Sequence, residues 1–82
     1  MPTVLVHAKG WRVVIYPNDH RPPHVHVLGP DVHARFELLC DLGQVKPLSN
    51  VGFTHSQLQT LANFLARHVK SLCKAWGEIH GH

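Results

Sequence analysis

Four of the nine histidines of this chain lie close together in one short segment, NDHRPPHVHVLGPDVHARF, which spans residues 18–36. His24 and His26 are two positions apart, and on a β-strand that spacing puts both imidazoles on the same face. Asp19 and His20 precede them, on a stretch whose backbone the double proline restricts. Two imidazoles with a carboxylate or a third imidazole nearby are ligands typical of zinc and related transition metals. The segment therefore indicates a metal site.

The same side chains have a second interpretation, which needs no metal. An imidazole beside a guanidinium is a sensible acid–base and anion-stabilising pair for phosphate chemistry, and an arginine follows in the next predicted strand. The residues of this catalytic hypothesis are His20, His24, His26 and Arg35. The residues of the metal hypothesis are Asp19, His20, His24 and His26. A histidine-rich but solvated sheet face is the plain structural alternative, so the sequence leaves open whether the protein is an enzyme.

These residues belong to the first of two parts of the chain, residues 1–50, which is predicted to be rich in strands. Runs of β-branched and aromatic residues alternate there with turns that contain Gly, Pro, Asn and Asp. The expected strands are residues 4–7, 12–16, 24–28, 32–39 and, as an edge strand because it contains a proline, 45–48.

The third and fourth of these strands form a predicted hairpin with one apolar and one polar face. Pairing apolar with apolar side chains allows two registers. In the first, His26 lies opposite His33, and after a slip of two residues it lies opposite Arg35 instead. In either register the polar face carries His24, His26 and Arg35, and His33 is expected beside them. That face would present the histidines while the opposite face meets the helix.

The second part of the chain, residues 54–81, is predicted to form one long helix. Thr54 followed by Gln57 fits a capping box, and Gly81 is a typical helix end. Apolar residues recur between them at three- and four-residue spacing, which predicts a stripe that packs on the sheet: Leu58, Leu61, Ala62, Leu65, Val69, Leu72, Cys73, Trp76 and Ile79. His80 falls inside the stripe, either as a boundary residue or as one that closes a side of the site.

Together the two parts predict a single α+β domain over residues 1–82. It would have a small antiparallel sheet of about four strands packed on one long C-terminal helix. A chain of 82 residues with 44% hydrophobic and 16% charged residues is typical of a globular domain.

The formal charge of +3 is compatible with an anionic ligand, RNA or an acidic partner protein, and requires none of them. Cys40 and Cys73 are too few to indicate a disulfide framework, so we expect two reduced, buried thiols. The chain shows no signal-peptide pattern and no apolar run long enough to span a membrane, so the predicted location is the cytoplasm.

The segment IYPNDHRPPHVHVLGPD and the later AWGEIHG resemble an uncharacterised bacterial family, domain of unknown function 4160, along nearly the whole chain. The family signature Asp-His-x-Pro-Pro-His-x-His-Val is matched by Asp19, His20, Pro22, Pro23, His24, His26 and Val27. The late tryptophan and the Ile-His-Gly ending are matched by Trp76, Ile79, His80 and Gly81. His33 is not part of this pattern, which weakens it as a site residue.

The resemblance implies a partner rather than an activity. Genes of this family often lie beside those of a second small family, domain of unknown function 2442, and such pairs look like toxin–antitoxin modules. The implied function is that of a partner-binding, toxin-like member of such a module, whose partner is a small protein encoded by an adjacent gene. Two alternatives stay open: a metal-dependent or histidine-based phosphodiester hydrolase that acts on RNA, and a non-enzymatic nucleic-acid-binding protein. A homodimer formed through an exposed edge strand is a further expectation.

Overall fold

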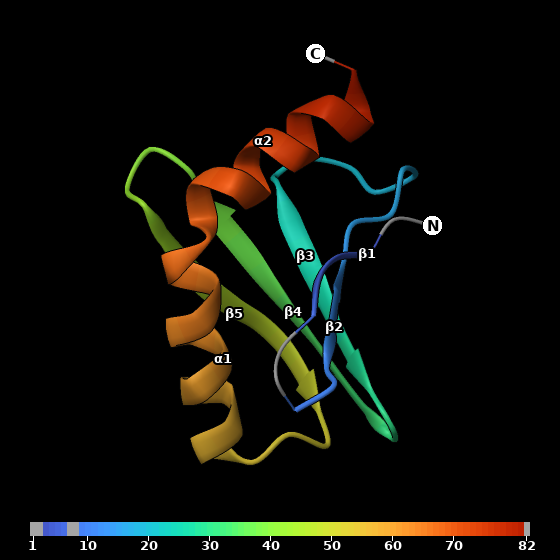
Figure 1. Ribbon diagram of the computed structural model, residues 1–82, viewed down its shortest axis with the longest axis vertical. Coiled ribbons are helices and arrows are strands. Elements are labelled where there is room, and N and C mark those ends of the chain that lie inside the picture. The colour runs from blue at the N-terminus through green and yellow to red at the C-terminus, as the bar shows by residue number, and fades with distance from the viewer. Residues whose placement is uncertain (1–2, 7–8, 82) are drawn as a thin grey trace.

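The computed structural model describes residues 3–6 and 9–81, which form an antiparallel sheet followed by two helices (Figure 1). The strands are β1 (Thr3–Val6), β2 (Arg12–Val14), β3 (His24–Gly29), β4 (Val32–Leu39) and β5 (Gln44–Val51). The helices are α1 (His55–Arg67) and α2 (Val69–His80). Each strand pairs with its neighbour in the sequence, in the order β1-β2-β3-β4-β5.

The predicted α+β class is confirmed, and the structure differs from the prediction in two details. The described residues form five strands rather than about four, one at each of the five expected regions, and the edge strand β5 has eight residues rather than the expected four. The helical segment is divided in two rather than continuous. His7, the last residue of the expected first strand, lies outside the described residues.

The β3–β4 hairpin has the second of the two registers that the sequence allowed. His26 lies opposite Arg35, and His24 lies opposite Glu37. Asp31 sits in the tight turn with a φ of 61°, a left-handed conformation that aspartate tolerates better than most residues. The apolar face of the hairpin is buried, as its alternation predicted, through Val25, Val27, Ala34, Phe36 and Leu38.

The helical segment begins as predicted and breaks at His68. Thr54 Oγ1 accepts a hydrogen bond from the backbone nitrogen of Gln57, 3.1 Å away, and Gln57 Oε1 accepts one from the Thr54 nitrogen, 2.9 Å away. His68 leaves helical geometry with φ −114° and ψ 12° and ends α1. Gly81 ends α2 in the left-handed conformation. As a result α2 leaves α1 at an angle and crosses the end of the sheet where β3 begins (Figure 1).

Both helices bury the predicted stripe in a single core with the apolar face of the sheet. The buried members are Leu61, Leu65, Val69, Leu72 and Trp76, and the partly buried members are Leu58, Ala62, Cys73 and Ile79. None of the helices in the described part of the chain has the length and apolar character needed to cross a membrane.

The prediction of two reduced, buried thiols is wrong. Cys40, which directly follows β4, and Cys73, which lies on α2, form a disulfide with their Cα atoms 6.1 Å apart. Cys40 is exposed. The two residues are 33 positions apart, and only the docking of α2 against the sheet brings them together, which two cysteines in a sequence cannot reveal. By chain entropy, a cross-link over a loop of this length stabilises the fold by about 3–4 kcal/mol.

Candidate metal centre

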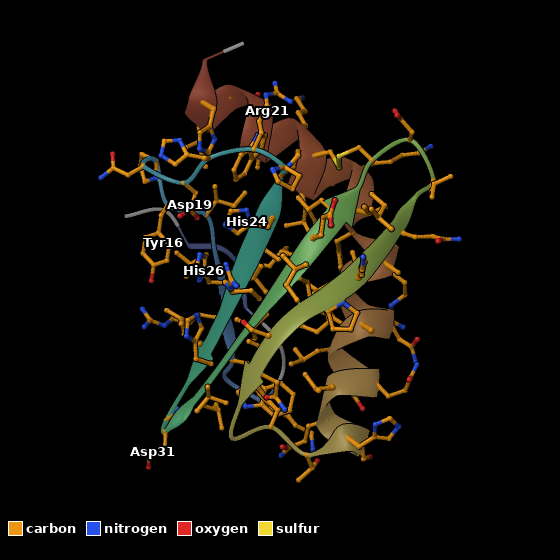
Figure 2. All side chains as sticks on the ribbon, turned by 180° about the vertical axis from the view of Figure 1, so that it is seen from behind. Tyr16, Asp19, Arg21, His24, His26 and Asp31 are labelled. Carbon is orange, nitrogen blue, oxygen red and sulfur yellow. A yellow bond between two sulfur atoms is a disulfide. The ribbon has the colours of Figure 1, made fainter. Side chains whose placement is uncertain are left out.

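Three side chains that can ligate a metal converge where the loop before β3 meets the strand (Figure 2). Nε2 of His24 lies 3.2 Å, and Nε2 of His26 lies 3.1 Å, from the same carboxylate oxygen, Oδ2 of Asp19. One ligand atom from each residue lies within 4.8 Å of the other two. A tetrahedral zinc ion with bonds about 2.1 Å long separates neighbouring ligand atoms by about 3.4 Å. The observed separations from Asp19 are therefore close to those that one shared ion requires.

The loop and the end of α2 fix the position of Asp19. The Asp19 nitrogen donates to the carbonyl oxygen of Tyr16, 3.1 Å away, which closes a turn with Pro17 at its second position. On the other side, Nε2 of His80 lies 3.1 Å from the carbonyl oxygen of Asp19. The ring of His80 stacks on Trp76 with centroids 3.8 Å apart. His80 therefore contacts the backbone that carries the carboxylate rather than the carboxylate itself.

His24 is buried, and its surroundings determine which ring nitrogen carries hydrogen. Its Nδ1 lies 2.9 Å from the carbonyl oxygen of Pro22, and because a carbonyl can only accept, Nδ1 must donate. Nε2 of a neutral His24 ring is then a lone pair that faces the Asp19 carboxylate. This contact is favourable only if the ring takes a second proton or if a cation lies between the two groups. A backbone carbonyl that holds Nδ1–H is the arrangement typical around metal-binding histidines.

His26 is only 12% exposed and is held by two neighbours besides Asp19. The ring of Tyr16 packs edge-on against it at 4.7 Å, and His33 Nε2 lies 2.9 Å from His26 Nδ1. The protons can be shared in two ways. In one, His33 donates to His26, which donates to Asp19. In the other, His26 Nδ1 donates to His33 and leaves Nε2 as a lone pair, which is the form a metal ion needs.

Burial lowers the pKa of His26 below its ordinary value of 6.5. The charge of Asp19 and its hydrogen bond act in the opposite direction, and the neighbouring His24 and His33 add to the lowering. The neutral imidazole, which is the metal-binding form, is thereby favoured at neutral pH.

The other predicted site residues lie outside the triad of Asp19, His24 and His26. Arg35 is exposed on the same face of the sheet, and its Nε donates to Ser49 Oγ at 3.0 Å. His20 is exposed, and the group of possible metal ligands found among the described residues does not include it.

His33 joins the cluster although the resemblance gave no reason to expect it. Strand alternation had already placed it on the polar face, because His33 and Arg35 are two positions apart, and only its absence from the family pattern weakened it as a site residue.

The fold and this cluster define a small α+β protein with a candidate metal centre at one end of its sheet. The chain belongs to the family described as Domain of unknown function (DUF4160), whose family model matches residues 10–77. The resemblance seen in the sequence is thus confirmed, and the matched range holds all three residues of the triad. The chain matches no curated protein and no solved structure.

Proposed function

We propose that the protein is a metal-dependent phosphodiester hydrolase in which Asp19, His24 and His26 hold one divalent transition metal ion such as zinc. The observation that carries the proposal is that Nε2 of His24 and Nε2 of His26 both lie against one carboxylate oxygen of Asp19, at 3.2 and 3.1 Å. Because Nδ1 of His24 faces the Pro22 carbonyl, Nε2 of the neutral ring presents a lone pair to that oxygen. A second proton on the ring or a bound cation makes this contact favourable, and a cation satisfies all three groups at once.

The residues around the triad fit hydrolysis of an anionic substrate. A metal with three protein ligands keeps a position for water and lowers the pKa of that water to about 7. Arg35, opposite His26 on β4, supplies a positive charge for a phosphodiester, and its bond to Ser49 through Nε leaves the two terminal nitrogens available. This face of the sheet is not covered by α1 (Figure 2), so an extended polymer such as RNA could reach it.

Metal affinity is the first test. Untagged protein is titrated with zinc against a chromogenic chelator, for wild type and for His24→Ala/His26→Ala. We expect near-stoichiometric binding to wild type and its loss in the variant, with the fold checked by circular dichroism. His55→Ala/His68→Ala, which removes two histidines from outside the site, is the matched control and should bind as wild type does. Equal binding by all three proteins would overturn the proposed site.

RNA cleavage is the second test. Zinc-loaded wild type should cleave a labelled single-stranded RNA, and His24→Ala/His26→Ala should not. Arg35→Ala should weaken RNA binding while it leaves zinc affinity unchanged, because its guanidinium contacts Ser49 rather than a ligand. RNA bound in a salt-dependent way but never cleaved would favour the non-enzymatic nucleic-acid-binding function instead.

We also propose that the protein is the partner-binding, toxin-like member of a two-gene module in the cytoplasm, and that its partner, a small protein encoded by the adjacent gene, pairs with β5. The supporting observation is that β5 is an edge strand, exposed along most of its length, with Leu48 40% and Val51 66% exposed. Such an edge offers backbone groups to a strand from another chain. This function is compatible with hydrolysis of RNA.

Coexpression tests the partner proposal. Expression of this chain alone should slow growth, and the adjacent gene product should relieve the effect. In the purified complex, hydrogen exchange of residues 44–51 should slow. Leu48→Lys should weaken the complex without a change in zinc affinity. Harmless expression with no copurifying partner would contradict the proposal, and protection of the same residues in the isolated protein at high concentration would identify a homodimer.

A further inference from the structure

We propose that the Cys40–Cys73 disulfide is a redox latch for the metal centre, so that the oxidised protein holds the ion more tightly than the reduced protein. The inference rests on the proposed metal site and adds its regulation. It starts from a placement that nothing in the sequence indicated: the disulfide ties α2 to the end of β4, and α2 contacts two of the three ligand residues.

The contacts from the disulfide to the site run along one helix. Trp76 lies three residues after Cys73, and His80 lies four residues after Trp76, so the three share a side of α2. Trp76 is 2% exposed and packs against His24 with ring centroids 5.4 Å apart. His80 stacks on Trp76 and reaches the carbonyl oxygen of Asp19. A shift of α2 would therefore move Trp76, which packs against His24, and His80, which contacts the backbone of Asp19.

The disulfide is also close to the loop that carries the site. A pocket of about 400 Å³ is lined both by Arg21 and Pro23 of that loop and by Cys40 and Asp41. Pro23 in turn accepts a hydrogen bond from the Leu38 nitrogen at 2.8 Å, which ties the loop to β4. Opening the disulfide therefore frees Cys40, which lines the same pocket as the loop that carries the site.

The latch is expected to tune the site rather than to switch it on and off. At its start α2 has no side-chain cap from His68, so its first turn is weakly anchored by polar contacts. Val69, Leu72 and Trp76 are buried in the core, and we expect this apolar packing to hold α2 on the sheet without the covalent link. Couplings between two sites typically change affinity by about 5- to 150-fold, and we expect about 10-fold here.

The chemistry of the latch is ordinary thiol–disulfide exchange. A thiolate of a small dithiol attacks one sulfur of the exposed disulfide and forms a mixed disulfide, and its second thiol then displaces the protein thiolate. The dithiol ends as a cyclic disulfide, while two electrons and two protons pass to Cys40 and Cys73. Oxidised glutathione can re-form the disulfide: a protein thiolate attacks it and releases one glutathione, and the second protein thiolate then displaces the other.

The first experiment compares zinc affinity in the absence of any reductant. Oxidised wild type is titrated beside Cys40→Ser/Cys73→Ser, which lacks the link and has no thiol to bind zinc. We expect binding about 10-fold weaker in the folded variant. Equal affinities would overturn the latch and leave the metal site intact. Failure of oxidised wild type to bind zinc would instead overturn the proposed function itself.

The second experiment works even if the serine variant does not fold. By linkage, zinc must shift the thiol–disulfide equilibrium of the protein toward the disulfide by the factor with which the disulfide raises zinc affinity. The equilibrium is measured in a dithiol redox buffer with and without zinc. His24→Ala/His26→Ala is the matched control, because it keeps both cysteines and so reports the effect of zinc on the thiols and on the buffer alone. Zinc should hold wild type further toward the disulfide than this control, and equal equilibria in the two proteins would overturn the latch.

Hydrogen exchange of the metal-free protein then shows whether reduction of the disulfide loosens α2 alone or the whole fold. Reduction should speed exchange in residues 69–80 while the amides of β2 and β3 stay protected. If protection is lost together throughout the described residues, the disulfide supports the whole fold and is not a latch for the site.

Discussion

The two ends of the β3–β4 hairpin are held together by different kinds of contact. At the turn end the chain is packed so closely that two glycine positions have no room for a side chain. A Cβ added to Gly29 would lie 2.8 Å from Cδ1 of Trp11, and one added to Gly52 would lie 2.7 Å from the carbonyl oxygen of Asp31. Trp11 and Phe53 pack edge-on beside them at 5.2 Å. This end is built from backbone and apolar surface.

At the other end of the hairpin, polar side chains are gathered where a fold alone would not need them. His24, His26 and Asp19 are largely shielded from water, and polar groups cost free energy when they are buried unless each finds a partner. The partners they find are chiefly one another, His33 and backbone carbonyls. The packing at the turn end stabilises the fold. At the opposite end the buried polar groups lower stability, and a bound ligand would offset that loss.

Gly52→Ala should have the largest effect, and it should be confined to stability. Gly52 has a φ of 91°, and the added Cβ would press on the backbone of Asp31. We expect the free energy of unfolding to fall by about 2–4 kcal/mol from the strained conformation and the overpacking together. Urea denaturation measures this loss. Zinc affinity of the folded variant should equal that of wild type, and a parallel loss of affinity would show that the two ends are coupled.

Asp19→Asn should lower zinc affinity and leave the stability of the fold nearly unchanged, which is the opposite of the effect of Gly52→Ala. The amide keeps the shape of the side chain but removes the charge that both histidines face, so zinc affinity should fall by at least the 10- to 100-fold typical of weaker, outer-shell changes. The free energy of unfolding of the metal-free protein should change by about 1 kcal/mol at most, because the amide of asparagine can still hydrogen-bond to the ring nitrogens that face it.

The matched control for this variant is Asp31→Asn at the turn end. The substitution is chemically identical, and asparagine also tolerates the left-handed conformation found there. Zinc affinity should be unchanged in this variant. Equal losses in both variants would mean that overall charge, and not the carboxylate at position 19, determines metal binding.

Local patterns explain what could be predicted from the sequence. The capping box at Thr54, the apolar stripe of the helices and the polar face of the hairpin each depend on residues a few positions apart, whose spacing fixes which side they share. The same reasoning brought His24 and His26 together and put Arg35 on their face.

What escaped prediction depends on contacts between distant segments. The disulfide requires α2 to cross the end of β4, and that crossing follows from the break at His68, a residue with no helix-breaking chemistry of its own. The exclusion of His20 from the cluster depends on the path of a loop, which spacing does not specify. His33 was given less weight because the family signature does not include it, although alternation along its strand already placed it on the polar face.

His33→Ala tests a residue that supports the site without belonging to the triad. Loss of the partner of His26 Nδ1 frees the ring to rotate, so zinc affinity should fall by about 10-fold, at the low end for such partners. The free energy of unfolding should stay within about 0.5 kcal/mol because His33 is exposed. His55→Ala, at an exposed helix start, is the control. An affinity equal to that of wild type would mean that the His26–His33 contact does not orient the ligand.

The smallest expected effect is a lowered pKa of His26 in the metal-free protein. Its pKa should lie below 6.5, because burial outweighs the opposing charge of Asp19. As the pH falls through 6.5 toward that lower value, the unfolded chain takes up a proton here before the folded chain does, so this residue makes the fold less stable in acid. Ring-proton NMR, with the signal assigned from His26→Gln, measures the pKa. Asp19→Asn should lower the pKa further, and a wild-type pKa above 6.5 would show that the carboxylate outweighs burial and that the resting site favours a proton over a metal ion.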